Sequence, residues 1–152
     1  MPTENEALVR GVIEVLFNQK RAHLIDAFYS PECRGSSPDG PFDSCDGFRA
    51  HFEKYATAFP DFRLDINYML LDGDRVAVHY TFLGTHAGQL AGYRPSGRTL
   101  KVPGMMISRI ANRSIIEQYF LWDNLGPRRQ LWLASLAEPG TDNQDRAINA
   151  EG

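Results

Sequence analysis

The spacing of apolar residues changes near residue 62, and this change constrains the fold more than any other feature of the chain. Before it, apolar side chains recur at helical spacing over residues 3–18 and 44–58, and Thr3 with Glu6 forms a capping-box pattern. After it, apolar and polar residues alternate, which predicts strands over 63–71, 75–86, 99–111 and 114–124. Helices followed by a run of strands predict an α+β domain.

The remaining segments complete the predicted domain. A short helix is expected over residues 21–28, and the Gly, Ser and Pro residues from 30 to 42 predict irregular chain that could form a rim. Residues 138–152 have no apolar period, so we expect a disordered tail after a single domain at 1–137. A strongly curved sheet closed on one side by helices can form a cone that holds one small ligand.

The composition gives no reason to expect nucleic acid or a membrane as a partner. With 16 Lys and Arg against 19 Asp and Glu, the net charge is −3, which gives no electrostatic reason to expect nucleic acid or an anionic membrane. No apolar run reaches the roughly 18 residues of a membrane span, and the first residues lack a basic segment. Cys33 and Cys45 are expected to be free thiols in a reducing compartment. We therefore expect a cytoplasmic protein.

The sequence contains no motif for a bound metal or cofactor. The histidines are scattered and no Cys, His and acid cluster has ligand spacing, so no metal site is predicted. There is also no phosphate-binding glycine loop and no Gly-x-Ser-x-Gly elbow. We expect no cofactor, and any chemistry should use side chains alone.

The stretch 114–124 carries the main candidate for chemistry. Strict alternation would place Glu117, Tyr119 and Asp123 on one mixed face of the strand. A carboxylate beside apolar groups is a candidate general base; the alternative is an aspartate that caps the turn before Gly126. The opposite, apolar face, which carries Gln118, Phe120 and Trp122, is expected to pack on a helix or a second subunit, which favours a homodimer packed through the sheet.

Three groups of motifs resemble a known family over about residues 8 to 133. They are the segments 59–61 and 71–76, then 84–88 and 95–97, and finally 109–110, 123–126 and 130–131. Their order and spacing resemble the SnoaL-like polyketide cyclases and ester cyclases of the NTF2-like superfamily. The resemblance implies a cone of helices on a curved mixed or antiparallel sheet. It also implies cofactor-independent aldol closure with Asp123 as general acid and base.

The sequence departs from the anthracycline cyclases at the partners of this aspartate. Gly104 and Met106 fall where those enzymes carry a glutamine and a histidine, and Gly35 falls where they carry an asparagine. A histidine common in other ester-cyclase-like chains falls at Gln118. We expect Asp123 to be catalytic, with His86 and Tyr119 polarising oxygen. The expected substrate-binding residues are Phe52, Tyr55, His79, Gly104 and Met106.

The functional hypothesis is a cofactor-independent cyclase or isomerase that acts on a hydrophobic, polyketide-like and enolisable small molecule. Two alternatives remain open. One is a non-catalytic binder of a hydrophobic small molecule, or a dimeric interaction module, which the loss of polar partners at Gly104 and Met106 favours. The other is an epoxide hydrolase or hydratase on the same fold, which would require a second acid or an asparagine to position water.

Overall fold

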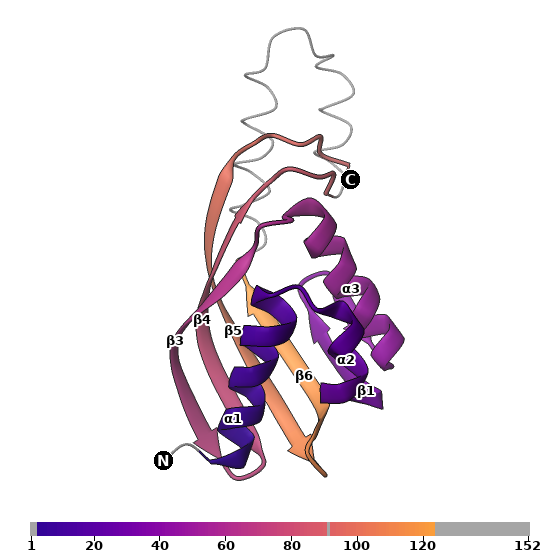
Figure 1. Ribbon diagram of the computed structural model, residues 1–152, viewed down its shortest axis with the longest axis vertical. Coiled ribbons are helices and arrows are strands. Elements are labelled where there is room, and N and C mark those ends of the chain that lie inside the picture. Colours follow the sequence, from indigo (N-terminus) through magenta and orange to yellow (C-terminus); the bar gives the residue numbers. More distant parts are fainter. Residues whose placement is uncertain (1–2, 91, 124–152) are drawn as a thin grey trace, which may run out of the picture.

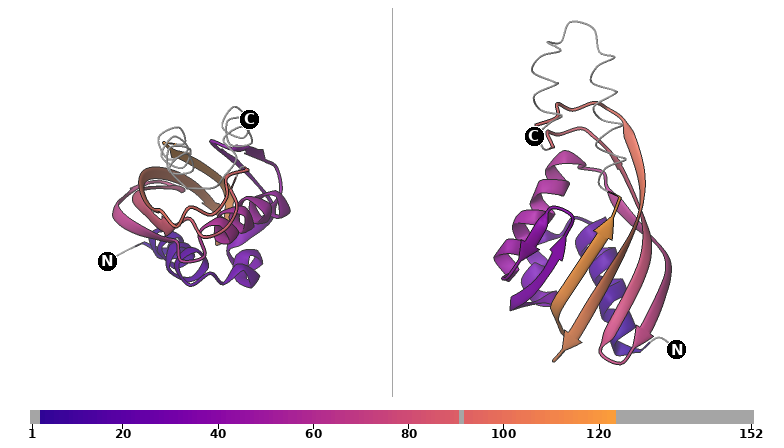
Figure 2. Two further views of the ribbon diagram at one scale, coloured as in Figure 1. Left: turned by 90° about the horizontal axis from the view of Figure 1, so that it is seen from above. Right: turned by 180° about the vertical axis from the view of Figure 1, so that it is seen from behind.

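A computed structural model describes residues 3–90 and 92–123 (Figure 1). Helices cover one face of a single curved sheet, and the sheet bends around them (Figures 1 and 2). The helical segments are α1 (Glu4–Gly11), the π-helical η1 (Val12–Asn18), the 3₁₀ turn η2 (Ala22–Leu24), α2 (Ile25–Phe28) and α3 (Cys45–Ala58). The strands are β1 (Tyr29–Ser37), β2 (Gly40–Phe42), β3 (Arg63–Asp72), β4 (Arg75–Thr85), β5 (Thr99–Ala111) and β6 (Ser114–Trp122).

The ends of the helices follow the sequence signals. The Thr3 hydroxyl accepts a hydrogen bond from the Glu6 backbone N–H, and the Glu6 side chain accepts one from the Thr3 N–H, so the predicted capping box is confirmed. Ser44 caps α3 by accepting from the Gly47 N–H at 3.1 Å. This helix ends before Pro60, which lacks an N–H and disfavours helix in the residue before it.

The sheet has the strand order β2-β1-β6-β5-β4-β3, and it is mixed because β1 runs parallel to β6 while the other neighbours are antiparallel. The expected α+β architecture with a curved mixed sheet is confirmed. The helices bury their apolar side chains against the inner face of this sheet. The core includes Val9, Val12, Ile13 and Leu16 from α1 and η1, Phe48 and Phe52 from α3, and Val76, Val78, Leu100, Val102 and Ile115 from the sheet.

Residues 30–42 correct one expectation, because they form β1 and β2 instead of irregular chain. Gly35 allows this pairing: a Cβ on Gly35 would lie 1.7 Å from the carbonyl oxygen of Gln118 on β6. The segment therefore enters the sheet at a position where only a residue without a Cβ fits beside its neighbour. The hairpin turn that follows β1 brings residues 37–40 toward α3.

A bulge in β6 corrects a second expectation. Ile110 pairs with Ile115 but Arg109 pairs with Glu117, so Ile116 is an extra residue and strict alternation fails there. Beyond the bulge, Gln118, Phe120 and Trp122 face the helices, while Tyr119 and Leu121 are exposed on the outer face. The mixed face of β6 faces away from the interior, and its apolar face packs toward the helices, which is one of the two arrangements expected for it.

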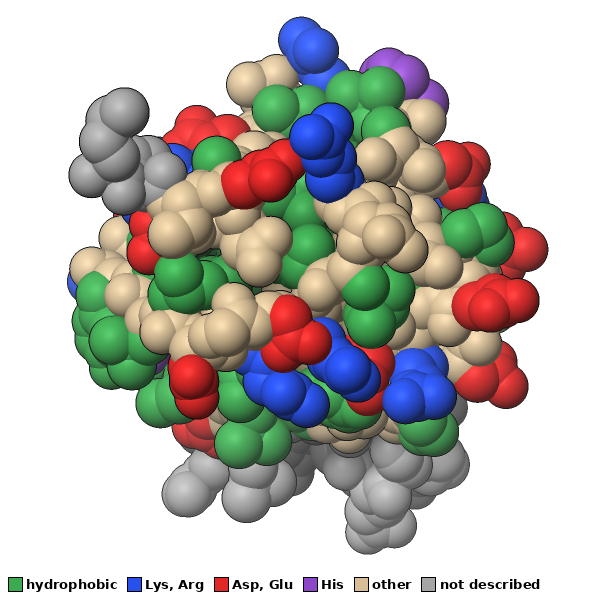
Figure 3. Space-filling view, turned by 90° about the horizontal axis from the view of Figure 1, so that it is seen from below, with side chains coloured by type: hydrophobic (Ala, Val, Ile, Leu, Met, Phe, Trp, Pro, Cys, Tyr) green, Lys and Arg blue, Asp and Glu red, His purple; other side chains and the backbone are tan. Residues whose placement is uncertain are grey.

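The end of the molecule that carries the N-terminus has charges of both signs. Arg113 lies 2.8 Å from Glu4, and Arg109 lies 2.9 Å from Asp74. In the view from below, basic side chains lie beside acidic ones among apolar and other groups (Figure 3). Within residues 3–90 and 92–123, no helix combines the length and apolar character needed to cross a membrane.

Candidate active site

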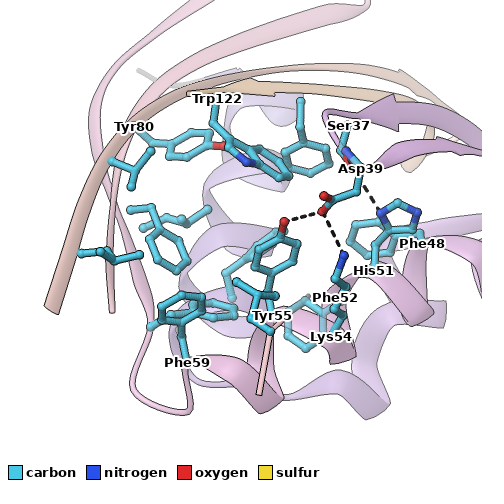
Figure 4. Close-up of a pocket in the computed structure, with 18 of the residues that line it drawn as sticks. Ser37, Asp39, Phe48, His51, Phe52, Lys54, Tyr55, Phe59, Tyr80 and Trp122 are labelled. Carbon is cyan, nitrogen blue, oxygen red and sulfur yellow. Dashed lines mark hydrogen bonds and ion pairs between the residues drawn. The ribbon is translucent and has the colours of Figure 1, made fainter. Parts of the chain in front are cut away.

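A pocket lies between the inner face of the sheet and helix α3, and most of its wall is aromatic (Figure 4). The space open to the centres of water molecules amounts to about 120 Å³. The apolar wall consists of Phe17, Phe42, Phe48, Phe52, Phe59, Phe62, Leu64, Tyr80, Phe82, Leu90, Tyr93, Leu100, Val102, Phe120 and Trp122. Aromatic faces and edges of this kind suit a flat, largely apolar ligand.

Polar groups in the described wall gather at one end, which we call the polar end. It consists of Ser37, Asp39, His51, Lys54 and Tyr55. The Tyr55 hydroxyl donates a hydrogen bond to Oδ2 of Asp39, and the Lys54 ammonium lies 3.6 Å from the same oxygen. Ser37 Oγ lies 3.4 Å from Nδ1 of His51. The polar end therefore joins the β1–β2 turn to α3 at the pocket.

Tyr80 presents a second polar group to the pocket, on the sheet side. Its ring lies over Gly104, because a Cβ on Gly104 would be 2.5 Å from Cζ and 2.6 Å from the hydroxyl oxygen of Tyr80. Gly104 pairs with Tyr80 on β4 and with Trp122 on β6, so these three residues form one row across the sheet. Burial raises the pKa of Tyr80, so its hydroxyl keeps its proton at neutral pH and can donate.

Of the expected substrate-binding residues, Phe52 and Tyr55 line the pocket. Gly104 contributes indirectly, by leaving the space that the Tyr80 ring occupies. Met106 is fully buried and contacts Gln118 Nε2 through its sulfur at 3.7 Å, and it is absent from the described wall. His79 lies on the outer face of β4, where Nδ1 is 3.2 Å from the amide nitrogen of Asn67. The sheet separates His79 from the pocket.

The two expected oxygen-polarising residues also lie away from the described wall. Tyr119 is 42% exposed on the outer face of β6, opposite Phe120 and Trp122, and its hydroxyl donates to Glu117 at 2.9 Å. His86 is fully buried, and its Nδ1 accepts from the Ser96 N–H at 3.2 Å. Burial lowers the pKa of His86. This histidine ties the segment between β4 and β5 together and does not reach the pocket.

Asp123 directly follows Trp122, whose side chain lines the pocket, and Asp123 itself is exposed. Its Cα atom therefore lies about 3.8 Å from that of a residue in the pocket wall. The carboxylate of Asp123 is not part of the described wall. The family-like residues 124–126 and 130–131 lie outside the described residues.

Sequence reasoning missed Asp39, His51 and Lys54 as pocket residues. His51 and Lys54 looked like the solvated side of a helix, and Asp39 lay in a segment expected to be irregular. One signal was available, because Pro38-Asp39-Gly40 is a strong turn sequence that can fold β1 back on β2. Among the described residues, no three His, Cys, Asp or Glu side chains are grouped so that they could hold a metal ion.

A curved mixed sheet with helices over its inner face is also the fold of an NTF2-like protein from Burkholderia pseudomallei, which has a TM-score of 0.72 at 20% identity and covers 86% of this chain and 98% of that one. The family model for SnoaL-like polyketide cyclases matches residues 7–131, and the chain belongs to this family. A comparison with curated proteins gave no match.

Solved structures share the fold. AclR from Streptomyces galilaeus has a TM-score of 0.76 at 23% identity, with 84% of this chain and 95% of AclR covered. A SnoaL-like protein from Jannaschia sp. CCS1 has a TM-score of 0.78 at 19% identity, covering 90% of this chain and 94% of that one. IdmH from Streptomyces antibioticus has a TM-score of 0.74 at 22% identity, with 85% of this chain and 99% of IdmH covered. At these identities the likeness concerns the fold.

Proposed function

We propose that this protein is a cofactor-independent cyclase or isomerase that moves a proton on an enolisable, largely apolar small molecule. The observation that carries the proposal is the aromatic pocket with polar groups at defined points of its wall, in a chain of the SnoaL-like family. An apolar wall excludes water from a bound ligand, which strengthens electrostatic contacts with the few polar groups that remain.

In this proposal Asp123 is the general base and acid. Its carboxylate takes a proton from the carbon next to a carbonyl group, and the electron pair of that C–H bond forms the enolate. The enolate carbon then attacks a second carbonyl in a cyclisation, or is reprotonated elsewhere in an isomerisation. The carboxyl group of Asp123 returns the proton to the new alkoxide or carbon, so no cofactor or co-reactant is consumed.

Tyr80 takes the oxygen-polarising role that sequence reasoning gave to Tyr119 and His86. Its hydroxyl faces the pocket beside Trp122, the residue that precedes Asp123 (Figure 4). A phenol that keeps its proton can donate to a carbonyl oxygen and donates more strongly as that oxygen becomes negative. Tyr80 and Asp123 would thus act on the two ends of one enolising group.

The test is deuterium incorporation from heavy water into a panel of β-keto esters and aromatic ketones, followed by NMR. Wild-type protein should accelerate exchange next to the carbonyl group, and Asp123→Asn should remove this acceleration because an amide cannot take the proton. Full exchange by Asp123→Asn would contradict the proposed base.

A non-catalytic binder of hydrophobic molecules is the second candidate, because the described pocket wall is almost entirely apolar and excludes Asp123. The two functions differ in their response to Asp123→Leu. If the protein is a binder, Asp123→Leu should keep or tighten the affinity for an aromatic ketone. The wild-type protein should then not accelerate deuterium exchange. An enzyme should lose exchange.

A further inference from the structure

We propose that Cys33 and Cys45 form a reversible redox pair, which a low-molecular-weight disulfide closes into a bond that links β1 to the first turn of α3. The sequence contains these two cysteines and no other, and in the structure both thiols are free and buried. The bond is a covalent modification of the fold, and it does not depend on the proton transfer proposed above.

The β1–β2 hairpin brings the two cysteines to the same level of the sheet. Gly35 on β1 pairs with Phe42 on β2, and the two strands are antiparallel. Cys33 lies two residues before Gly35 and Ser44 lies two residues after Phe42, so the same register places Cys33 level with Ser44. Cys45 directly follows Ser44 and begins α3. The chain therefore returns to the level of Cys33 where the helix starts.

The two thiols meet inside the core. Cys33 and Cys45 lie within hydrogen-bonding reach of each other, and both belong to the cluster of buried apolar residues. Helix α3 also packs closely on β1, since the ring centroid of Phe48 is 4.2 Å from that of Tyr29. A disulfide requires two residues whose side chains already point at each other, because it tolerates little displacement of the backbone. Cys33 and Cys45 meet this requirement from two separate elements.

Cys45 is the thiol that an oxidant reaches first. Its Sγ donates to Oδ1 of Asp26 at 3.6 Å, and the Asp26 side chain is 74% exposed. Asp26 belongs to α2, a helix of four residues. Short elements with few internal hydrogen bonds open at low cost. Movement of α2 would thus open a path from solvent to the buried sulfur of Cys45.

The charges around the pair also assign the first attack to Cys45. Burial, and then the neighbouring Cys45, raise the pKa of Cys33 to about 12, so Cys33 keeps its proton at neutral pH. Burial and Asp26 raise the pKa of Cys45 as well, but the Arg49 guanidinium and the Cys33 thiol oppose this rise. Cys45 is also the first residue of a 14-residue helix, where the helix dipole favours a thiolate.

The bond forms through two thiol–disulfide exchanges. The Cys45 thiolate attacks one sulfur of the small disulfide, which gives a mixed disulfide and releases one small thiolate, and this thiolate takes up the proton that Cys45 lost. The Cys33 sulfur then attacks the Cys45 sulfur, and its proton passes to the second small thiolate as it leaves. The protein loses two electrons and two protons, and the small disulfide gains both. An excess of small thiol reverses the two steps.

Closure of the bond would fix the start of α3, the helix that carries Phe48 and Phe52 into the pocket wall. A disulfide restricts the unfolded chain, so the oxidised fold should be more stable than the reduced fold. Thermodynamic linkage then requires that the folded protein favours the bond over the unfolded protein by the same factor. This factor can be measured without a pocket ligand and without an activity.

The experiment measures the oxidation equilibrium of the full chain at pH 7 in mixtures of reduced and oxidised glutathione, with and without concentrated urea. Acid quenching, alkylation and mass spectrometry of the intact chain give the fraction that has lost two hydrogen atoms. We expect the equilibrium constant for the bond to be about 10- to 100-fold larger in the folded protein than in urea. The oxidised protein should also melt several degrees above the reduced protein.

The matched control combines Cys33→Ser with Arg34→Cys. It keeps two cysteines at nearly the same spacing, but it moves one thiol to the opposite face of β1, where Arg34 now pairs with Glu117. In urea the control should oxidise as wild type does, whereas in the folded state its equilibrium constant should fall below the value in urea. Cys45→Ser should form no bond within the chain, and circular dichroism checks that each variant folds.

Three results would overturn the redox pair. The first is an equilibrium constant that is no larger in the folded wild-type protein than in urea. The second is the same constant for the folded wild-type protein and the folded control with Cys33→Ser and Arg34→Cys. The third is a bond that forms only between two chains, which doubles the mass of the oxidised protein.

Discussion

The hydroxyl oxygen of Tyr80 lies directly over Gly104, where an added Cβ would come within 2.6 Å of it. This contact explains why a glycine at residue 104 fits a pocket that the anthracycline cyclases build with polar side chains on the same strand. The space left by the missing side chain is filled by a tyrosine from the neighbouring strand. The phenol therefore supplies a polar group to the same region of the sheet.

Tyr80→Phe should lower the rate of deuterium exchange about 10- to 100-fold, because it removes one donor to the developing enolate oxygen. The melting temperature should change little, because no hydrogen bond to the Tyr80 hydroxyl is found among the described residues. Tyr93→Phe is the matched control, since Tyr93 also lines the pocket but comes from the segment between β4 and β5, and it should exchange within about twofold of wild type. Equal rates in wild type and Tyr80→Phe would exclude Tyr80 as the polarising group.

Gly104→Ala should destabilise the fold by about 1–3 kcal/mol, the usual cost of forcing a methyl group into a packed site. The new Cβ would push the Tyr80 ring toward the pocket and reduce ligand binding as well. Gly11→Ala provides the contrast, because a Cβ there would lie 4.0 Å from Phe28 and alanine favours helix by about 1 kcal/mol over glycine. Urea unfolding of both variants measures the difference in the free energy of unfolding. If Gly104→Ala is as stable as wild type, the row formed by Tyr80, Gly104 and Trp122 is loosely packed.

Glu117 makes stability depend on pH in the acid range. Hydrogen bonds from Arg109, and also from Tyr119 and Arg34, lower the pKa of Glu117 to about 2. The folded state therefore favours the ionised carboxylate, and this stabilisation is present above about pH 4.5 and disappears as the pH falls toward 2.

Glu117→Gln should thus reduce the free energy of unfolding by about 1–2 kcal/mol at pH 7, allowing for solvent screening, and by almost nothing near pH 2. Asp65→Asn is a suitable comparison, because its ion pair with Arg63 is exposed and should contribute less than about 1 kcal/mol. Denaturant titrations at several pH values provide the measurement. A difference between wild type and Glu117→Gln that does not vary with pH would contradict the assignment.

We propose that the outer face of the sheet forms a homodimer. Exposed apolar side chains gather there, in register across the strands: Met105 beside Leu121 and Ile107 beside Tyr119. Tyr68 and Leu70 on β3 add to the same group of exposed apolar residues. Contiguous apolar surface of this kind often marks a contact with another chain.

Leu121→Glu should convert the dimer to a monomer, because it places a charge where the side chain is 71% exposed in one chain and would be buried between two. Ala50→Glu, on the exposed side of α3, should leave the dimer intact. Sedimentation equilibrium gives the mass directly. A wild-type protein with the mass of one chain at all concentrations would rule the dimer out.

The sequence predicts the fold better than it predicts the pocket, and β6 shows why. The change from helical to strand period, the Thr3 capping box and the turn positions depend on local chemistry, and each is found in the structure. Alternation correctly separates Tyr119 from Trp122, but it does not tell which of the two faces of β6 lies toward the helices. The site was expected on the mixed face that carries Tyr119, whereas Phe120 and Trp122 on the apolar face line the pocket.

Asp39 and Tyr55 show a second limit. They are 16 residues apart and meet only because the β1–β2 turn folds back against α3. Tyr55 could be assigned to the pocket from helical spacing with Phe52, but the partner of its hydroxyl depends on tertiary packing. The segment before Asp39, with its serines and prolines, also resembles irregular chain until β6 is available to pair with it.

The most direct test of the central claim is the rate of deuterium incorporation into 2-tetralone, a bicyclic aromatic ketone, with wild-type protein and with Asp123→Asn. The account predicts exchange above the buffer rate for wild type and a loss of about 100-fold or more in that excess rate for the variant, as expected when a general base is removed. If wild type binds 2-tetralone without accelerating exchange, or if Asp123→Asn exchanges as fast as wild type, the proposed proton transfer by Asp123 is wrong.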